Sequence, residues 1–133
     1  MDIINKKTTL DDIKKFLSEN GYECDEVVEN RLIFTIKGVK SSAAMMPSGN
    51  ILFMITLQLK DGLNEYEVLK KVNEINFQII SGNLSVKDGV AMFCYTLIRP
   101  YGMGAKSFKE FVDYHTFTMS YIVEELGLSE ITK

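Results

Sequence analysis

The residues that could carry chemistry in this 133-residue chain are few and scattered. His115 is the only histidine, and the local sequence places no serine, cysteine or acid beside it to form a nucleophilic pair. A single histidine without a ligand motif gives no better support for a metal site. His115 falls within the apolar stripe of an expected helix, where a neutral imidazole needs only one hydrogen bond to a neighbour. We therefore predict a buried structural histidine, with no catalytic and no metal-binding residues.

A glycine-containing segment, residues 102–107 (GMGAKS), lies between an expected strand and an expected helix. That position is typical of a phosphate-binding loop, which needs Gly-Lys-Ser/Thr in direct succession. Here Ala105 separates the second glycine from Lys106, so the spacing does not fit. We interpret Ser107 as a helix N-cap that forms a capping box with Glu110, and we predict no cofactor.

Composition and charge exclude several classes of protein. Eighteen acidic residues against 15 basic ones give a net charge of -3 and a pI near 5.2, without the basic footprint of a nucleic-acid-binding protein. The longest uncharged stretch, residues 41–59, contains a Pro-Ser-Gly-Asn turn and is not a membrane span. No secretory signal is visible, so we expect a cytoplasmic protein in which Cys24 and Cys94 are buried, reduced thiols.

Apolar periodicity divides the chain into alternating helical and extended segments. Period-two alternation predicts strands, and between Ile51 and Leu59 it directs the odd-numbered residues toward the core. Asn64, with Glu67 three residues later, predicts the start of a middle helix. The expected helices span residues 9–20, 64–82 and 107–126, and the expected strands span 31–37, 39–46, 51–59, 83–86 and 90–98.

The order of these segments predicts an α+β fold. Short hairpins imply antiparallel pairing of the strands, and helices that separate blocks of strands are expected to pack on the sheet. We therefore expect residues 1–133 to form one domain with the order α-β-β-β-α-β-β-α. The strand at 90–98 is apolar on both faces, which predicts a central strand covered on each side.

Two of the expected helices carry a second apolar stripe that the sheet alone cannot cover. In the middle helix this stripe contains Tyr66, Leu69, Phe77 and Ile80, and in the last helix it contains Tyr114, Phe117 and Tyr121. A third layer within the same chain could bury these residues. The alternative is a homodimer or partner interface, where aromatic residues are enriched and charged residues are depleted.

The seven methionines divide into two groups by position. Core filling is the expected role of Met54, Met92 and Met119. Met45, Met46 and Met103 lie near expected turns, and methionine side chains adapt to varied apolar partners. We therefore regard these three as candidate contacts with a protein partner.

Several segments together resemble a known family. They are Phe16-Leu17 with Asn20-Gly21-Tyr22, then Val72-Asn73-Glu74-Ile75-Asn76, the hairpin at 82–90 and the helix at 107–126. On these segments the chain resembles the YbjN-like proteins, proposed bacterial sensory-transduction regulators whose fold is similar to that of type III secretion chaperones. The resemblance implies a compact α+β domain, often dimeric, that binds proteins and does not transform substrates.

The favoured hypothesis is a non-enzymatic protein-interaction module, chaperone-like or regulatory, that forms a homodimer. Its contact would be either the stripe of Tyr114, Phe117 and Tyr121 or the stripe that includes Tyr66 and Phe77. The alternative is a small-molecule-binding regulatory domain with a pocket between the sheet and the helices. An enzyme is the least favoured of the three classes, because no nucleophile motif accompanies the one histidine.

Overall fold

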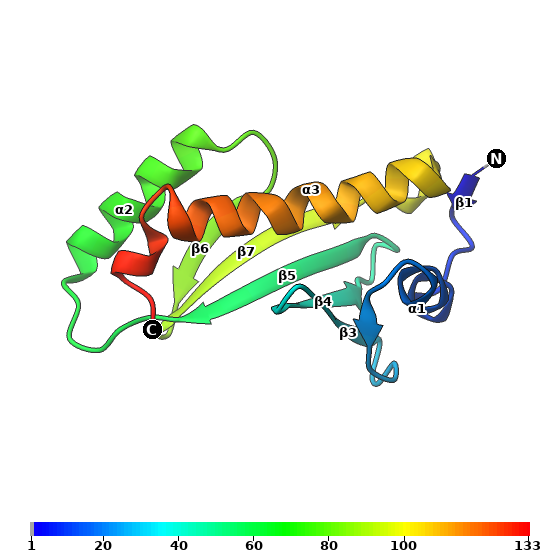
Figure 1. Ribbon diagram of the computed structural model, residues 1–133, viewed down its shortest axis with the longest axis horizontal. Coiled ribbons are helices and arrows are strands. Elements are labelled where there is room, and N and C mark those ends of the chain that lie inside the picture. The colour runs from blue at the N-terminus through cyan, green and yellow to red at the C-terminus, as the bar shows by residue number, and fades with distance from the viewer. Residues whose placement is uncertain (1) are drawn as a thin grey trace.

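A six-stranded antiparallel sheet organises the molecule in the computed structural model, which describes residues 2–133 (Figure 1). The strand order is β2-β3-β4-β5-β7-β6. The strands are β2 (Glu23–Cys24), β3 (Arg31–Ile36), β4 (Val39–Met45), β5 (Ile51–Gln58), β6 (Asn83–Lys87) and β7 (Val90–Leu97). A separate two-stranded pair joins β1 (Asp2–Ile4) to β8 (Met103–Gly104).

Three helices cover one face of this sheet. They are α1 (Leu10–Glu19), α2 (Glu65–Gln78) and α3 (Ala105–Glu124), with short 3-10 turns η1 (Arg99–Tyr101) and η2 (Leu128–Glu130). Figure 1 shows α3 running lengthwise over β5 and β7, with α2 at one end of the molecule and α1 at the other. The predicted α+β fold and element order are confirmed, with short strands β1, β2 and β8 added to the expected set.

The core lies between the sheet and the helices. One row across the sheet pairs Leu32 with Ala43, Ala43 with Phe53, and Phe53 with Tyr95. All four side chains are buried, as are the odd-numbered residues Ile51, Phe53 and Ile55 that alternation assigns to the core. Period-two alternation therefore predicts which side of each strand meets the helices.

Side-chain caps fix the start of two helices. Thr9 caps α1 in a complete capping box with Asp12, and the Asn64 side chain accepts the Glu67 N–H at the start of α2. The prediction for α3 was wrong, because the helix begins at Ala105 with Gly104 as an uncapped N-terminus, and Ser107 lies inside it. The pairing of Met103–Gly104 with β1 holds the backbone extended up to Gly104, which allows the helix to start two residues before Ser107.

The predicted end of the middle helix at residue 82 was also wrong. Helix α2 stops at Gln78, and the backbone of Ile79 is already extended. The chain must turn here toward β6, and Gly82 makes this possible with a φ of +85°. A side chain at Gly82 would meet the Phe93 ring at 2.6 Å, so only glycine fits this approach.

Within residues 2–133 no helix lies on the opposite face of the sheet, which corrects two expectations. Strand β7 is central, but only its Ala91, Phe93 and Tyr95 side is buried. Its other side belongs to a half-exposed row in which Met54 pairs with Cys94, and Met92 lies two residues away. Met54 and Met92 are thus surface residues and not core residues, and both cysteines are free and half-buried.

Candidate interaction surface

The most exposed apolar side chains of the described residues include two near the end of α2. Phe77 is 91% exposed and Ile80 is 93% exposed, while Tyr66 and Leu69 lie exposed on the same side of the helix. Val68, Val72 and Ile75 form the buried stripe of α2, and the exposed stripe lies about a third of a turn away. We call Tyr66, Leu69 and Phe77 of α2, together with Ile80 just after the helix, the α2 stripe.

One side chain, that of Asn76, occupies outward backbone groups of the edge strand β6 beside α2. The Asn76 amide donates to the Leu84 carbonyl and its oxygen accepts the Leu84 N–H, each at 2.8 Å. Because Leu84 lies in β6, these bonds occupy the outward backbone groups that another strand would use. Asn76 therefore fixes α2 to the sheet edge and blocks edge-to-edge pairing at this point. The sequence pattern singled out Asn76 but did not predict this role.

The aromatic stripe of α3 is less exposed than that of α2. Tyr114 is 43% exposed, Phe117 69% and Tyr121 45%. The Tyr114 ring packs edge-on against His115 with 5.3 Å between ring centroids, and Phe117 borders a cavity at the side of the helix. All five predicted aromatic contact residues are therefore exposed, with Tyr66 and Phe77 on α2 more open than Tyr114 and Tyr121 on α3.

His115 is buried, as predicted, and holds the loop after α2 against α3. Its Nδ1 donates to the Phe111 carbonyl at 2.7 Å, so in the neutral ring Nε2 accepts from the Ser81 hydroxyl at 2.8 Å. The ring stacks on Tyr95 with 4.0 Å between centroids. Burial lowers the pKa of His115, although the Phe111 carbonyl opposes this effect. The imidazole is therefore neutral at pH 7.

Sequence reasoning missed Ser81 as the partner of His115, since 34 residues separate them and no local spacing signals the contact. A serine bonded to a histidine is also half of a nucleophilic pair. In this case a backbone carbonyl, not an acid, orients the histidine, and its ring is buried against the Tyr95 ring. The geometry is that of a structural tether between α3 and the α2–β6 loop.

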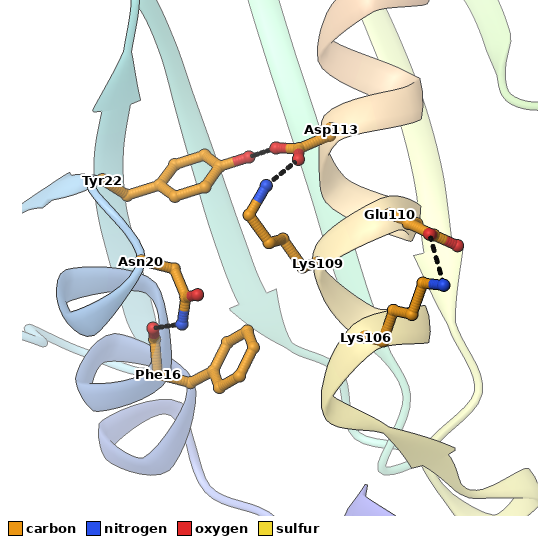
Figure 2. A network of polar contacts seen from close by, with 7 residues as sticks. All are labelled: Phe16, Asn20, Tyr22, Lys106, Lys109, Glu110 and Asp113. Atoms are coloured by element: carbon orange, nitrogen blue, oxygen red, sulfur yellow. Dashed lines mark hydrogen bonds and ion pairs between the residues drawn. The ribbon is translucent and has the colours of Figure 1, made fainter.

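A second tether joins α3 to the opposite end of the sheet (Figure 2). The Tyr22 hydroxyl, just after α1, donates to Asp113, whose other oxygen lies 2.5 Å from the Lys109 ammonium. Burial raises the pKa of Asp113, but the bonds and charges from Lys109 and Tyr22 outweigh it and leave the pKa lowered. The same burial, with the Asp113 contact, raises the pKa of Tyr22. The network has no net charge, because the Lys109 ammonium balances the Asp113 carboxylate and Tyr22 is neutral.

The three methionines predicted to contact partners are not gathered on one surface. Met45 and Met103 are half-buried against the core, and Met45 pairs with Ile51 across β4 and β5. Only Met46 is exposed, at 39%, beside the turn after β4. They therefore add little to a contact surface.

Within residues 2–133, no three His, Cys, Asp or Glu side chains come together as metal ligands. None of the helices in this same range has the length and hydropathy needed to cross a bilayer.

Comparisons with known proteins support the fold. No protein-family model matches the chain, and no curated protein matches it either. Among solved structures, the chain is similar to E. coli YbjN, described as a proposed transcription regulator, with a TM-score of 0.77 and 17% sequence identity. The match covers 98% of both chains. At this level of identity the likeness concerns the fold, and it confirms the structural resemblance to YbjN that the sequence segments predicted.

Proposed function

We propose that this protein is a non-enzymatic protein-interaction module of regulatory or chaperone-like type, that it works as a homodimer in the cytoplasm, and that the α2 stripe forms the dimer contact. The observation that carries the proposal is the near-complete exposure of Phe77, in the last turn of α2, and of Ile80, two residues after the helix. Exposed apolar patches larger than a few hundred Å², especially those with a polar rim, mark protein–protein interaction sites.

The size of the α2 stripe supports a contact between folded chains. Taking about 200 Å² for each aromatic side chain, Tyr66 and Phe77 alone expose roughly 300 Å². Leu69 lies between these two residues along the helix, and Ile80 adds apolar surface just after the helix end. A stable interface needs about 800 Å² from each partner, so the stripe supplies the apolar centre and the flanking polar residues of α2 supply the rim.

The hydrogen bonds of Asn76 to β6 favour a dimer contact through helices over one through paired strands. Because Asn76 occupies the outward backbone groups of Leu84, two copies cannot join their β6 edges into one continuous sheet through that residue. Two α2 helices can instead pack through their stripes around a two-fold axis, where each side contributes the same residues. The aromatic stripe of α3 then remains available to a different protein.

A regulatory role agrees with the lack of a reaction centre in the arrangement described above. His115 is neutral, enclosed and used as a tether. The structurally similar YbjN is itself described as a proposed regulator, which supports assigning this chain to the same broad kind of function.

Light scattering coupled to size-exclusion chromatography tests the proposal. We expect the unmodified protein to have the mass of a dimer and the variant Phe77→Glu to have the mass of a monomer, because the glutamate would be desolvated at the centre of the contact. Gln78→Glu is the matched control, since it places the same charge one residue later on a different side of the helix.

Circular dichroism must show the native helix content for both variants, which an exposed position allows. A monomeric unmodified protein would refute the dimer. A dimer that tolerates Phe77→Glu would refute the α2 stripe as its contact.

A further inference from the structure

Three sulfur-containing side chains lie together on the face of the sheet that the helices leave uncovered. They are Met54 of β5 and Met92 and Cys94 of β7. Met54 is paired directly with Cys94, and Met92 lies two residues before Cys94 on the same strand and the same face. Directly opposed residues of antiparallel strands have Cβ atoms about 4.5–5.5 Å apart, and diagonal neighbours lie about 7–8 Å apart. The register therefore gathers the three side chains above one place on the sheet.

The core does not require sulfur at these positions. Each of the three side chains is half-buried and lies on the side of its strand that faces away from the core. Cys94 is a free thiol. Methionine has three rotatable side-chain bonds, so the thioethers of Met54 and Met92 are able to turn toward the Cys94 sulfur.

The strand neighbours of this cluster are neutral. The positions paired with the three residues on the adjoining strands are Ser42, Thr56, Asn83 and Ser85. His115, the only histidine, is on the other side of the sheet, where its ring stacks on Tyr95. The paired positions thus add neither an imidazole nor a carboxylate to the three sulfur ligands.

This ligand set matches a soft, monovalent metal ion. Thioether and thiolate sulfurs select Cu(I), whereas carboxylate and carbonyl oxygens select harder cations. One Cu(I) ion with one thiolate and two thioethers has no net charge, which suits a half-buried, neutral surface. Zn(II) in the same place would keep a positive charge and would lack the fourth protein ligand of a structural zinc site.

We propose that Met54, Met92 and Cys94 bind one Cu(I) ion through their three sulfur atoms. Burial raises the pKa of Cys94, so the thiol of the metal-free protein is protonated at pH 7. As the Cu–S bond forms, the S–H bond breaks and its proton passes to water, while copper remains in the +1 state. The site lies on the face of the sheet opposite to α2 and does not depend on the dimer contact.

An anaerobic titration of the protein with Cu(I) tests the site. Ascorbate keeps the metal reduced, and the chromogenic chelator bicinchoninate competes for it and reports the free ion. We expect one Cu(I) ion per chain to be withdrawn from the chelator, and X-ray absorption of the loaded protein to show sulfur as the only type of ligand. Failure of the protein to withdraw Cu(I) from the chelator would overturn the proposal.

Three substitutions locate the ion. Cys94→Ser, Met54→Leu and Met92→Leu should each weaken Cu(I) binding at least about tenfold, because each removes one Cu–S bond. Leucine has nearly the volume of methionine, so the two leucine variants keep the fold. Cys24→Ser and Met46→Leu are the matched controls, since they remove the same kinds of sulfur elsewhere and should leave the affinity unchanged.

The controls also define the results that contradict the site. A loss of binding in Cys24→Ser, with none in Cys94→Ser, would place the ion at the other cysteine. Full affinity in both leucine variants would reduce the site to an adventitious thiolate. Either result overturns the proposal. The expected pattern must persist in Phe77→Glu, so that failure of this site and failure of the dimer contact are distinguished.

Discussion

Helices α2 and α3 have the same kind of sequence pattern, two apolar stripes each, yet the chain covers their second stripes differently. Phe77 on α2 is 91% exposed, whereas Phe117, the most exposed aromatic residue of the α3 stripe, is 69% exposed and Tyr114 and Tyr121 are less than half exposed. The reason is position, because α3 lies along the middle of the sheet while α2 lies at the β6 edge with neighbours mainly on one side (Figure 1). Periodicity thus identifies a second apolar face, and the position of the helix on the sheet decides how much of that face the same chain covers.

The largest effect expected from this difference is on the solution mass. Ile80→Glu, just after α2, should raise the dimer dissociation constant at least about 100-fold, since a charge would be desolvated in the contact. Phe117→Glu on α3 should leave the mass unchanged. Analytical ultracentrifugation over a range of protein concentrations gives both constants. If Phe117→Glu yields a monomer and Ile80→Glu a dimer, the interface belongs to α3.

A second substitution tests what holds α2 at the edge. Asn76→Ala removes two hydrogen bonds and leaves the Leu84 backbone groups exposed to strand pairing, so we expect a loss of about 2 kcal/mol in the free energy of unfolding. Glu74→Ala, at an exposed position of the same helix outside the α2 stripe, should cost no more than about 0.5 kcal/mol. Urea unfolding at one fixed protein concentration measures both, and equal costs would show that the Asn76 amide has no special role.

A third substitution tests the tether on the α1 side of α3. Tyr22→Phe deletes the hydroxyl that donates to Asp113 and should lower the free energy of unfolding by about 1.5 kcal/mol. Tyr121→Phe is the matched control on the half-exposed stripe of α3 and should change stability by less than about 0.5 kcal/mol. The account of this network fails if the control is as destabilising as Tyr22→Phe.

The smallest effect expected is a pH dependence from the tether between α3 and the α2–β6 loop. Burial lowers the pKa of His115 below its ordinary value of 6.5, so at mildly acidic pH the unfolded chain binds more protons than the folded one. Stability from this group is complete above pH 6.5 and is lost as the pH falls toward the lowered pKa. We expect Tm to fall by a few degrees from about pH 7.5 to 5.5 in the unmodified protein and to change less in His115→Gln. An identical slope in both proteins would assign the pH dependence to other groups.

Much of the fold could be predicted because it rests on local patterns. Alternation at Ile51, Phe53 and Ile55 identified the buried side of β5, and Asn64 marked the start of α2. The ends of helices were harder, because the start of α3 depends on pairing with β1, some 100 residues earlier in the chain. The sequence around residue 105 does not indicate that a strand so distant in the chain pairs with it.

The candidate site was predictable only in part for the same reason. Tyr66 and Phe77 were identified by helical spacing and are exposed. The contacts of His115 with Ser81, and of Tyr22 with Asp113, join segments distant in sequence and required the structure. Met54 and Met92 were assigned to the core because strand alternation shows two apolar faces without showing which of them the helices cover.

Cross-linking within the α2 stripe tests the dimer contact most directly. Asn73 is exposed and lies between Leu69 and Phe77 along the helix, so near a two-fold axis it should meet its own copy. With Cys24 and Cys94 replaced by serine, the account predicts that Asn73→Cys forms an intermolecular disulfide under mild oxidation and that Phe117→Cys does not. Rapid cross-linking through position 117, with none through position 73, would contradict it.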